Sequence, residues 1–166
     1  MLIDASPLIY LAKLEAFDVF EKSGHIPLVT PMVERETARP GLGYEYPDSL
    51  VIANALRSGN LKRTDLTPVE QQLANRLQTE SGGIDAGEAE VLAAAVERKL
   101  PALLYERRAM RLARSMGVDA WTPVRLFFAG TPDATVLSHR VSGFAGLVQM
   151  RFRDVQVLME LIEAEK

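Results

Sequence analysis

Short apolar runs alternate with longer helical segments along this chain of 166 residues. Strands that alternate with helices of roughly ten or more residues are typical of βαβ units, which build a parallel sheet with helices on both faces. The pattern therefore predicts an α/β fold of three layers: helix, sheet and helix. The runs with the apolar or β-branched composition of buried strands are residues 2–4, 26–30, 102–105 and 118–121.

Proline, glycine and serine indicate where the helices between these strands begin and end. Helices are predicted over residues 7–14, 16–22, 48–57, 68–79 and 148–162, and others are expected to begin at Pro31, near Asp85, after Glu106 and near Pro123. No repeat or linker divides the chain. We therefore expect one domain over residues 1–166, with C-terminal helices from about residue 122 packing on it.

The last predicted helix carries apolar residues at helical spacing. We expect this stripe to pack on the core, and a partner subunit is the less favoured alternative. The stripe consists of Phe152, Val155, Leu158, Met159 and Ile162.

Composition limits the function classes that remain. A formal net charge of −3 argues against binding nucleic acid by bulk electrostatics, although bound divalent cations would reverse the charge of an acidic site. The absence of cysteine excludes disulfides, thiol catalysis and thiolate metal sites. No apolar stretch approaches the roughly 18–20 residues of a membrane span and no signal peptide is evident, so we expect a soluble cytoplasmic protein without a membrane partner.

Asp4 ends the first strand run. Ligands of open α/β sheets bind beyond the carboxyl ends of the strands, so a carboxylate at this place is well positioned for chemistry. The alternative is that Asp4 only caps the following helix. Glu106 stands at the comparable place after the third run.

Two glutamates follow the second run. At about 100° per residue Glu36 lies on the side of Met32 and Val33, whereas Glu34 points away from Met32 towards water. Glu36 is therefore the better site candidate. The alternative for both is a structural acid that the helix dipole favours in the first turns.

Asp85 and Glu88 have the spacing of a capping box, which is the structural alternative for this pair. Glu88 also shares a helical stripe with Leu92, so it is expected to point towards the core. Glu90 lies about 200° away from Glu88 and is expected to be exposed. Gly87 would allow a close approach to the helix backbone.

Four carboxylates thus fall at strand ends or in the first turns of helices that follow strands, and in a parallel sheet these points share one edge. A buried cluster of like charges is unfavourable unless cations or protons neutralise it. Carboxylate oxygens suit Mg²⁺ or Mn²⁺, which can activate water for phosphodiester hydrolysis. The predicted metal ligands are Asp4, Glu36, Glu88 and Glu106.

These motifs resemble the PIN-domain family, the small metal-dependent ribonucleases that include the VapC-like toxins of toxin–antitoxin pairs. Residues 2–9 resemble the family's opening strand with its catalytic aspartate at Asp4 and its accompanying hydroxyl at Ser6. Residues 31–36 are similar to the segment of the second acid, best matched by Glu36. Residues 87–90 resemble a glycine–glutamate form of the third motif, with Glu88 as the acid. The resemblance covers most of the chain.

The fourth motif departs from the family pattern. Residues 103–111 resemble the strand that is followed by one or two aspartates and a basic helix, but Glu106 and Arg107 stand at the two acidic places. Glu106 could reach the metal with its longer side chain, or Arg107 could weaken metal binding. The basic stripe of this helix could bind phosphate, and a solvated face is the structural alternative.

The resemblance implies a PIN-like α/β/α fold with a short parallel sheet of about four to five strands, and an Mg²⁺- or Mn²⁺-dependent endoribonuclease. It implies Ser6 as a residue that orients a ligand or water, and Arg108 and Arg111 as contacts to the RNA backbone. A small antitoxin partner and a homodimer would follow from the toxin interpretation. Tyr44 and Tyr46 are expected to flank a substrate groove.

Two other interpretations remain at this stage. In the first, the PIN-like fold is a catalytically degenerate interaction module without nuclease activity. In the second, a phosphohydrolase forms an aspartyl-phosphate at Asp4, although the segment from Asp4 to Ser6 lacks the second aspartate usually paired with such a nucleophile.

Overall fold

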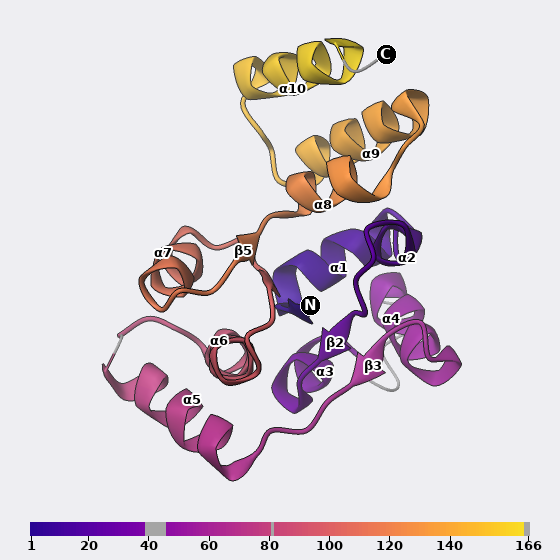
Figure 1. Ribbon diagram of the computed structural model, residues 1–166. Helices are drawn as coiled ribbons and strands as arrows, with labels where there is room; N and C mark the ends of the chain where they lie inside the picture. Colours follow the sequence, from indigo (N-terminus) through magenta and orange to yellow (C-terminus); the bar gives the residue numbers. More distant parts are fainter. Residues whose placement is uncertain (39–45, 81, 165–166) are drawn as a thin grey trace.

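The computed structural model describes residues 1–38, 46–80 and 82–164 (Figure 1). In this part of the chain five parallel strands form one sheet, in the order β3-β2-β1-β4-β5. The predicted α/β/α architecture is confirmed. The strands are β1 (Leu2–Ile3), β2 (Leu28–Val29), β3 (Lys62–Arg63), β4 (Ala102–Leu103) and β5 (Ala120–Trp121).

Helices connect the strands and flank the sheet on both sides (Figure 1). α6 packs directly on β1 and β4, α7 packs on β5, and α1 packs on α3 and α4. The described helices are α1 (Ala5–Lys13), α2 (Asp18–Lys22), α3 (Pro31–Thr37), α4 (Pro47–Ser58), α5 (Pro68–Glu80), α6 (Ala86–Arg98), α7 (Arg107–Ser115), α8 (Pro123–Gly130), α9 (Ala134–Leu147) and α10 (Phe152–Ala164). Tyr44 lies outside the described residues.

The central strands are fully apolar because both of their faces are covered. Every residue of β1 and β4 is buried, as expected for a parallel sheet between helix layers. The edge strand β3 consists instead of two exposed residues, Lys62 and Arg63. Its backbone pairs with β2, since Lys62 N–H donates to the Pro27 carbonyl at 3.0 Å. The sequence did not predict β3 because an edge strand with two polar residues has no apolar run.

β1 occupies the centre of the sheet, and its two neighbours belong to different parts of the chain. β2 lies on one side and β4 on the other. This arrangement creates a switch point, where the connections leave in opposite directions and ligands of α/β proteins bind beyond the strand ends. The residue that follows β1 is Asp4, whose backbone N–H donates to the Leu103 carbonyl at 3.1 Å.

The C-terminal helices add to the core through α9. Phe144 is buried and packs edge-to-face on Tyr10, Tyr105 and Phe127, with ring centroids 5.5, 5.7 and 6.0 Å away. α10 packs on α9 and is the outermost layer in Figure 1. Its predicted core stripe is only partly correct. Ile162 is buried, but Phe152 is 75% exposed, because α10 rests on one helix rather than on the sheet.

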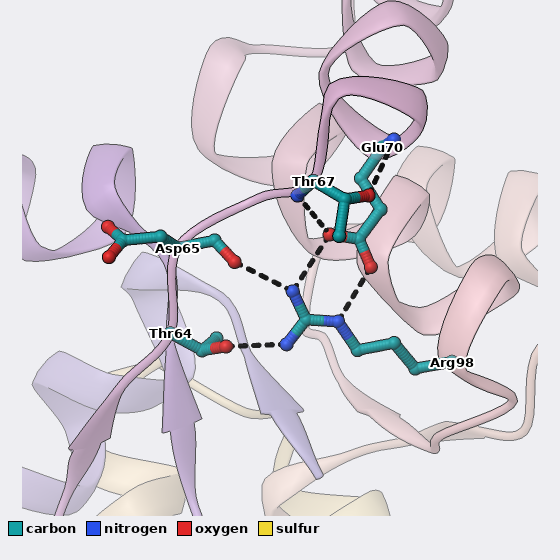
Figure 2. A network of polar contacts seen from close by, with 5 residues as sticks. All are labelled: Thr64, Asp65, Thr67, Glu70 and Arg98. Carbon is teal, nitrogen blue, oxygen red and sulfur yellow. Dashed lines mark hydrogen bonds and ion pairs between the residues drawn. The ribbon is translucent and has the colours of Figure 1, made fainter.

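A polar network fastens α5 to the end of α6 (Figure 2). The guanidinium of Arg98 donates to both carboxylate oxygens of Glu70, at 2.6 and 2.8 Å, and also to the Asp65 carbonyl at 2.8 Å. Glu70 in turn accepts from Thr67 N–H at 2.7 Å and so caps α5. Glu70 is only 1% exposed, and the hydrogen bonds from Arg98 hold its pKa below the ordinary value.

None of the helices in the described ranges is both long enough and apolar enough to cross a membrane.

Candidate functional site

Asp4 is held at the switch point by the end of β1 and the start of α1. It occupies the N-cap position with extended backbone angles, φ −80° and ψ 161°, but its side chain makes no cap hydrogen bond to the helix. The side chain therefore does not cap α1 in the usual way, although its carboxylate accepts from the N–H of Ala5, the first residue of the helix. At 3% exposure the carboxyl group is almost completely removed from water.

Burial raises the pKa of Asp4 to about 7, against an ordinary value of 3.8. The nearby carboxylates of Glu88, Asp85 and Glu36 contribute to this rise in the pKa, and hydrogen bonding from the Ala5 backbone N–H opposes it. A carboxylate surrounded by like charges is stabilised either by a proton or by a cation. Near neutral pH the metal-free protein therefore holds Asp4 partly protonated.

Glu36 lies against the first turn of α6, where Gly87 leaves room for it. A Cβ atom at Gly87 would stand 2.9 Å from Glu36 Oε2 and 3.4 Å from its Cδ. That separation is shorter than ordinary van der Waals contact, so any larger residue at position 87 would displace the carboxylate. The expected close approach to the Gly87 backbone is made by Glu36, a site candidate from another helix.

Glu34, in contrast, lies beside the edge strand. Its Oε2 is 3.3 Å from Arg63 Nε, and its side chain is 31% exposed. The side chain is therefore not simply directed into water as the helical spacing indicated. The ion pair gives Glu34 a structural partner at the sheet edge.

Asp85 and Glu88 form the predicted capping box at the start of α6. The Asp85 carboxylate accepts from Glu88 N–H at 2.8 Å, and Glu88 Oε2 accepts from Asp85 N–H at 3.2 Å. Glu88 is also 5% exposed, as its helical stripe predicted. Burial raises the pKa of Glu88, and the carboxylates of Asp85 and Glu106 contribute, whereas Arg108 acts in the opposite direction. The side chain thus caps the helix and belongs to the acidic cluster.

Glu90 was expected to be exposed, and that expectation is wrong. It is 8% exposed and accepts a 2.9 Å hydrogen bond from the backbone N–H of Met32. The cause is the packing of α6 against α3, whose first turn needs acceptors for its free N–H groups. Thr30, the N-cap of α3, supplies no side-chain cap bond. A contact across 58 residues gives no local sequence signal.

Thr30 stands where β2 ends and is the N-cap residue of α3. It is fully buried at the end of β2, next to β1, and its Oγ1 has no hydrogen-bond partner within the described residues. Ser6, the predicted hydroxyl, is half-buried in the first turn of α1, two residues after Asp4. Ser6 and Thr30 thus follow two adjacent strands, β1 and β2, at the edge of the sheet where Asp4 lies.

Glu106 and the basic residues lie at the rim. Glu106 is the N-cap of α7, makes no side-chain cap bond, and is exposed together with Arg107 and Arg108. The guanidinium of Arg108 occupies the space where a Cβ at Gly83 would stand. Arg108 and Arg111 also line one surface hollow with Ser115. The predicted basic contacts therefore share a side of α7, next to the acidic cluster.

The predicted ligands approach one another without forming a closed coordination shell. Among the residues that the structure describes, no three acidic or histidine side chains are set closely enough to hold one ion. Their charges nevertheless act on one another, since Glu36 and Glu88 both raise the pKa of Asp4. Carboxylate oxygens are also the donors that Mg²⁺ and Mn²⁺ prefer. The donor chemistry fits a hard divalent cation, and the present side-chain positions leave the carboxylates apart.

Comparison with known families gives one result. A family model described as a PIN domain matches residues 1–128, which run from β1 into α8. No curated protein and no solved structure gives a match.

Proposed function

This chain belongs to the PIN-domain family, whose members are generally nucleases, and from that premise we propose that it is a metal-dependent endoribonuclease that hydrolyses RNA phosphodiester bonds. The observation that carries the proposal is Asp4, a buried carboxylate at the switch point whose pKa is raised by burial and by three other carboxylates. Such a group gains stability from a bound cation. Mg²⁺ and Mn²⁺ are the cations that match its oxygen neighbours.

In this proposal Asp4, Glu36 and Glu88 hold the ion, and Glu106 assists from the rim. A bound divalent ion would supply an activated water and stabilise the leaving oxygen. Asp4 would hold the ion in its ionised form, and the absence of a side chain at Gly87 leaves room for the Glu36 carboxylate beside the first turn of α6. The burial of Asp4 excludes bulk water, which strengthens these electrostatic interactions.

Three further residues have roles in this proposal. Ser6 orients a ligand or the attacking water from the first turn of α1. Arg108 and Arg111 bind RNA phosphates from the exposed side of α7, where they line a common hollow. This local basic group offsets the acidic balance of the chain, whose formal net charge is −3.

A toxin role is a second part of the proposal, and it rests on the family alone. It implies a small antitoxin that restrains the nuclease in the cytoplasm, and a homodimer. This part is tested by expressing the chain with and without the protein that the neighbouring reading frame encodes. Growth arrest that the neighbour relieves would support it, and growth unaffected by the chain alone would contradict it.

The alternative function is a PIN-like interaction module without nuclease activity. It is favoured by Arg107 at the second place of the fourth motif and by the lack of a closed three-ligand group in the described ranges. Such a module should bind Mn²⁺ poorly. Calorimetric titration of the protein with Mn²⁺ therefore separates the two functions.

The direct test is the cleavage of a mixed labelled RNA in Mn²⁺, with EDTA and an Asp4→Asn variant as controls. Asp154→Asn is a matched control, because it removes an exposed carboxylate in the first turn of α10. We expect cleavage by the wild type and by Asp154→Asn, and none with EDTA or Asp4→Asn. Cleavage that survives both EDTA and Asp4→Asn would refute the proposed mechanism.

A further inference from the structure

A small cavity opens beside Glu36, between α1, α3 and the start of α4. Its volume is about 200 Å³, which is below the roughly 300–1,000 Å³ of sites that enclose drug-sized ligands. One flat ring system fits such a space better than a whole nucleotide does. The described residues that line the cavity are Ile9, Glu36, Thr37, Tyr46, Asp48 and Ser49.

The walls of the cavity combine apolar surface with two carboxylates, those of Glu36 and Asp48, of which only Glu36 is a proposed metal ligand. Ile9 is half-buried, and Tyr46 is 53% exposed immediately before α4, so its ring can receive a planar partner. The Thr37 hydroxyl is already engaged, since Oγ1 donates to the Val33 carbonyl at 2.7 Å. The Asp48 carboxylate has no hydrogen bond or ion pair to any residue in the ranges 1–38, 46–80 and 82–164.

We propose that this cavity is a nucleobase subsite that selects guanine. The inference rests on the proposed RNA cleavage, because the subsite would place a base of the substrate next to Glu36. Unpaired bases in protein–RNA complexes stack on aromatic side chains and are read along their Watson–Crick edges. Tyr46 provides the stacking surface, and Asp48 reads the edge.

Guanine is the base whose edge matches Asp48. An ionised carboxylate only accepts hydrogen bonds, and it does so with two oxygens. Guanine presents two adjacent donors on its Watson–Crick edge, N1–H and the N2 amino group, whereas adenine, cytosine and uracil each present one donor beside an acceptor. An acceptor that faces a carboxylate repels it, so the three other bases are selected against.

A hollow next to the cavity contains a lysine side chain. Tyr46 and Asp48 also line a second hollow, together with Lys13 and Glu15. Lys13 is exposed in the last turn of α1 and would pair with a substrate phosphate in this proposal. The cavity proposed for the base thus contains a proposed metal ligand, Glu36, and shares two lining residues with a hollow that contains a lysine.

The test uses Asp4→Asn protein in EDTA, so that neither cleavage nor metal enters the measurement. The probes are the four ribonucleoside 5′-monophosphates, titrated one at a time and followed by NMR or calorimetry. We expect GMP to bind at least tenfold more tightly than AMP, CMP and UMP. In an Asp48→Asn background this preference should disappear, because the amide is no longer a double acceptor.

Tyr46 variants separate stacking from selection. Tyr46→Ala should weaken the binding of all four nucleotides roughly tenfold, because base–aromatic stacking is lost. Tyr46→Phe should bind them as tightly as the Asp4→Asn protein does. Equal affinity for the four nucleotides, or a GMP preference that Asp48→Asn retains, would overturn the subsite. The result is independent of nuclease activity. Metal-dependent cleavage without preference for guanine would refute the subsite alone, and GMP selection without cleavage would refute the nuclease alone.

Discussion

Replacing Asp4 with asparagine should make the metal-free protein more stable at pH 8, although it removes the residue on which the proposed cleavage depends. Asp4 is 3% exposed, and its pKa is about 7 in the folded protein against an ordinary value of 3.8. A difference of one pKa unit between the folded and unfolded states corresponds to about 1.36 kcal/mol. The buried charge therefore lowers the free energy of unfolding by about 4 kcal/mol once the group is ionised in both states.

The sign of this effect follows from proton binding. Between about pH 4 and pH 7 the unfolded chain has lost the Asp4 proton and the folded protein retains it, so the contribution of Asp4 to stability falls as the pH rises. From about pH 8 the loss is nearly complete and stays constant. Asparagine carries no such charge. The stability gain of Asp4→Asn should be near zero at pH 4 and reach its full size at pH 8.

Urea unfolding in EDTA at several pH values measures this difference through the fluorescence of Trp121, the single tryptophan. Asp154→Asn is the control, since it neutralises an exposed carboxylate and should show no comparable pH-dependent gain. When Mn²⁺ replaces EDTA, the difference in stability between the two proteins should narrow, because in the proposed function the ion binds and stabilises the folded wild type and not the variant. A gap of equal size at pH 4 and pH 8, or an Asp4→Asn variant that is less stable at pH 8, would show that burial does not perturb the pKa of Asp4.

Three other substitutions test contacts elsewhere in the fold and at the site. Gly87→Ala should weaken Mn²⁺ binding roughly tenfold in calorimetry without loss of stability. Adding Glu36→Asp should recover part of the affinity, because the shorter side chain avoids the new methyl group. Unchanged Mn²⁺ affinity in Gly87→Ala would contradict the contact between Glu36 and position 87. Arg98→Met should lower the free energy of unfolding by about 3–5 kcal/mol, because it leaves the carboxylate of Glu70 buried and unpaired, and Glu70→Gln in the same chain should restore part of the loss in urea unfolding. In the wild type the depressed pKa of Glu70 means that this stabilisation is lost as the pH falls through the folded pKa, so acid titration of the unfolding midpoint is a further check. Phe144→Ala should lower the free energy of unfolding by about 3–5 kcal/mol in the same assay, although Phe144 lies outside the residues 1–128 that match the family model. A decrease below about 1 kcal/mol would show that α9 is not part of the core.

Sequence reasoning succeeded where the signal is local. The buried strands β1 and β4 appear as apolar runs, and Asp4 follows directly from the end of β1. The capping box of Asp85 and Glu88 is also a local pattern, and its hydrogen bonds are present. These features depend on residues within one turn or one strand, so a single chain carries all the information they need.

The features that were missed depend on packing between distant segments. The bond from Met32 to Glu90 spans 58 residues, and the Arg98–Glu70 pair spans 28. Helical spacing gives a direction around one helix, but it does not say which second helix covers that side. The sequence pattern predicted that Glu36 lies near the other acids. For the same reason it did not show that Gly87 determines where the Glu36 carboxylate lies.

The composition of β3 also bears on how the protein behaves at high concentration. An outermost strand leaves one row of backbone N–H and C=O groups unpaired, and such a row can recruit a strand from another molecule. Both residues of β3 are exposed and carry positive charge. The ion pairs of Arg63 with Glu34 and Asp65 balance its charge, but both side chains keep this border charged and hydrated, which disfavours pairing with an apolar strand of another molecule. The same two residues that conceal β3 from sequence inspection thus protect this edge of the sheet from aggregation.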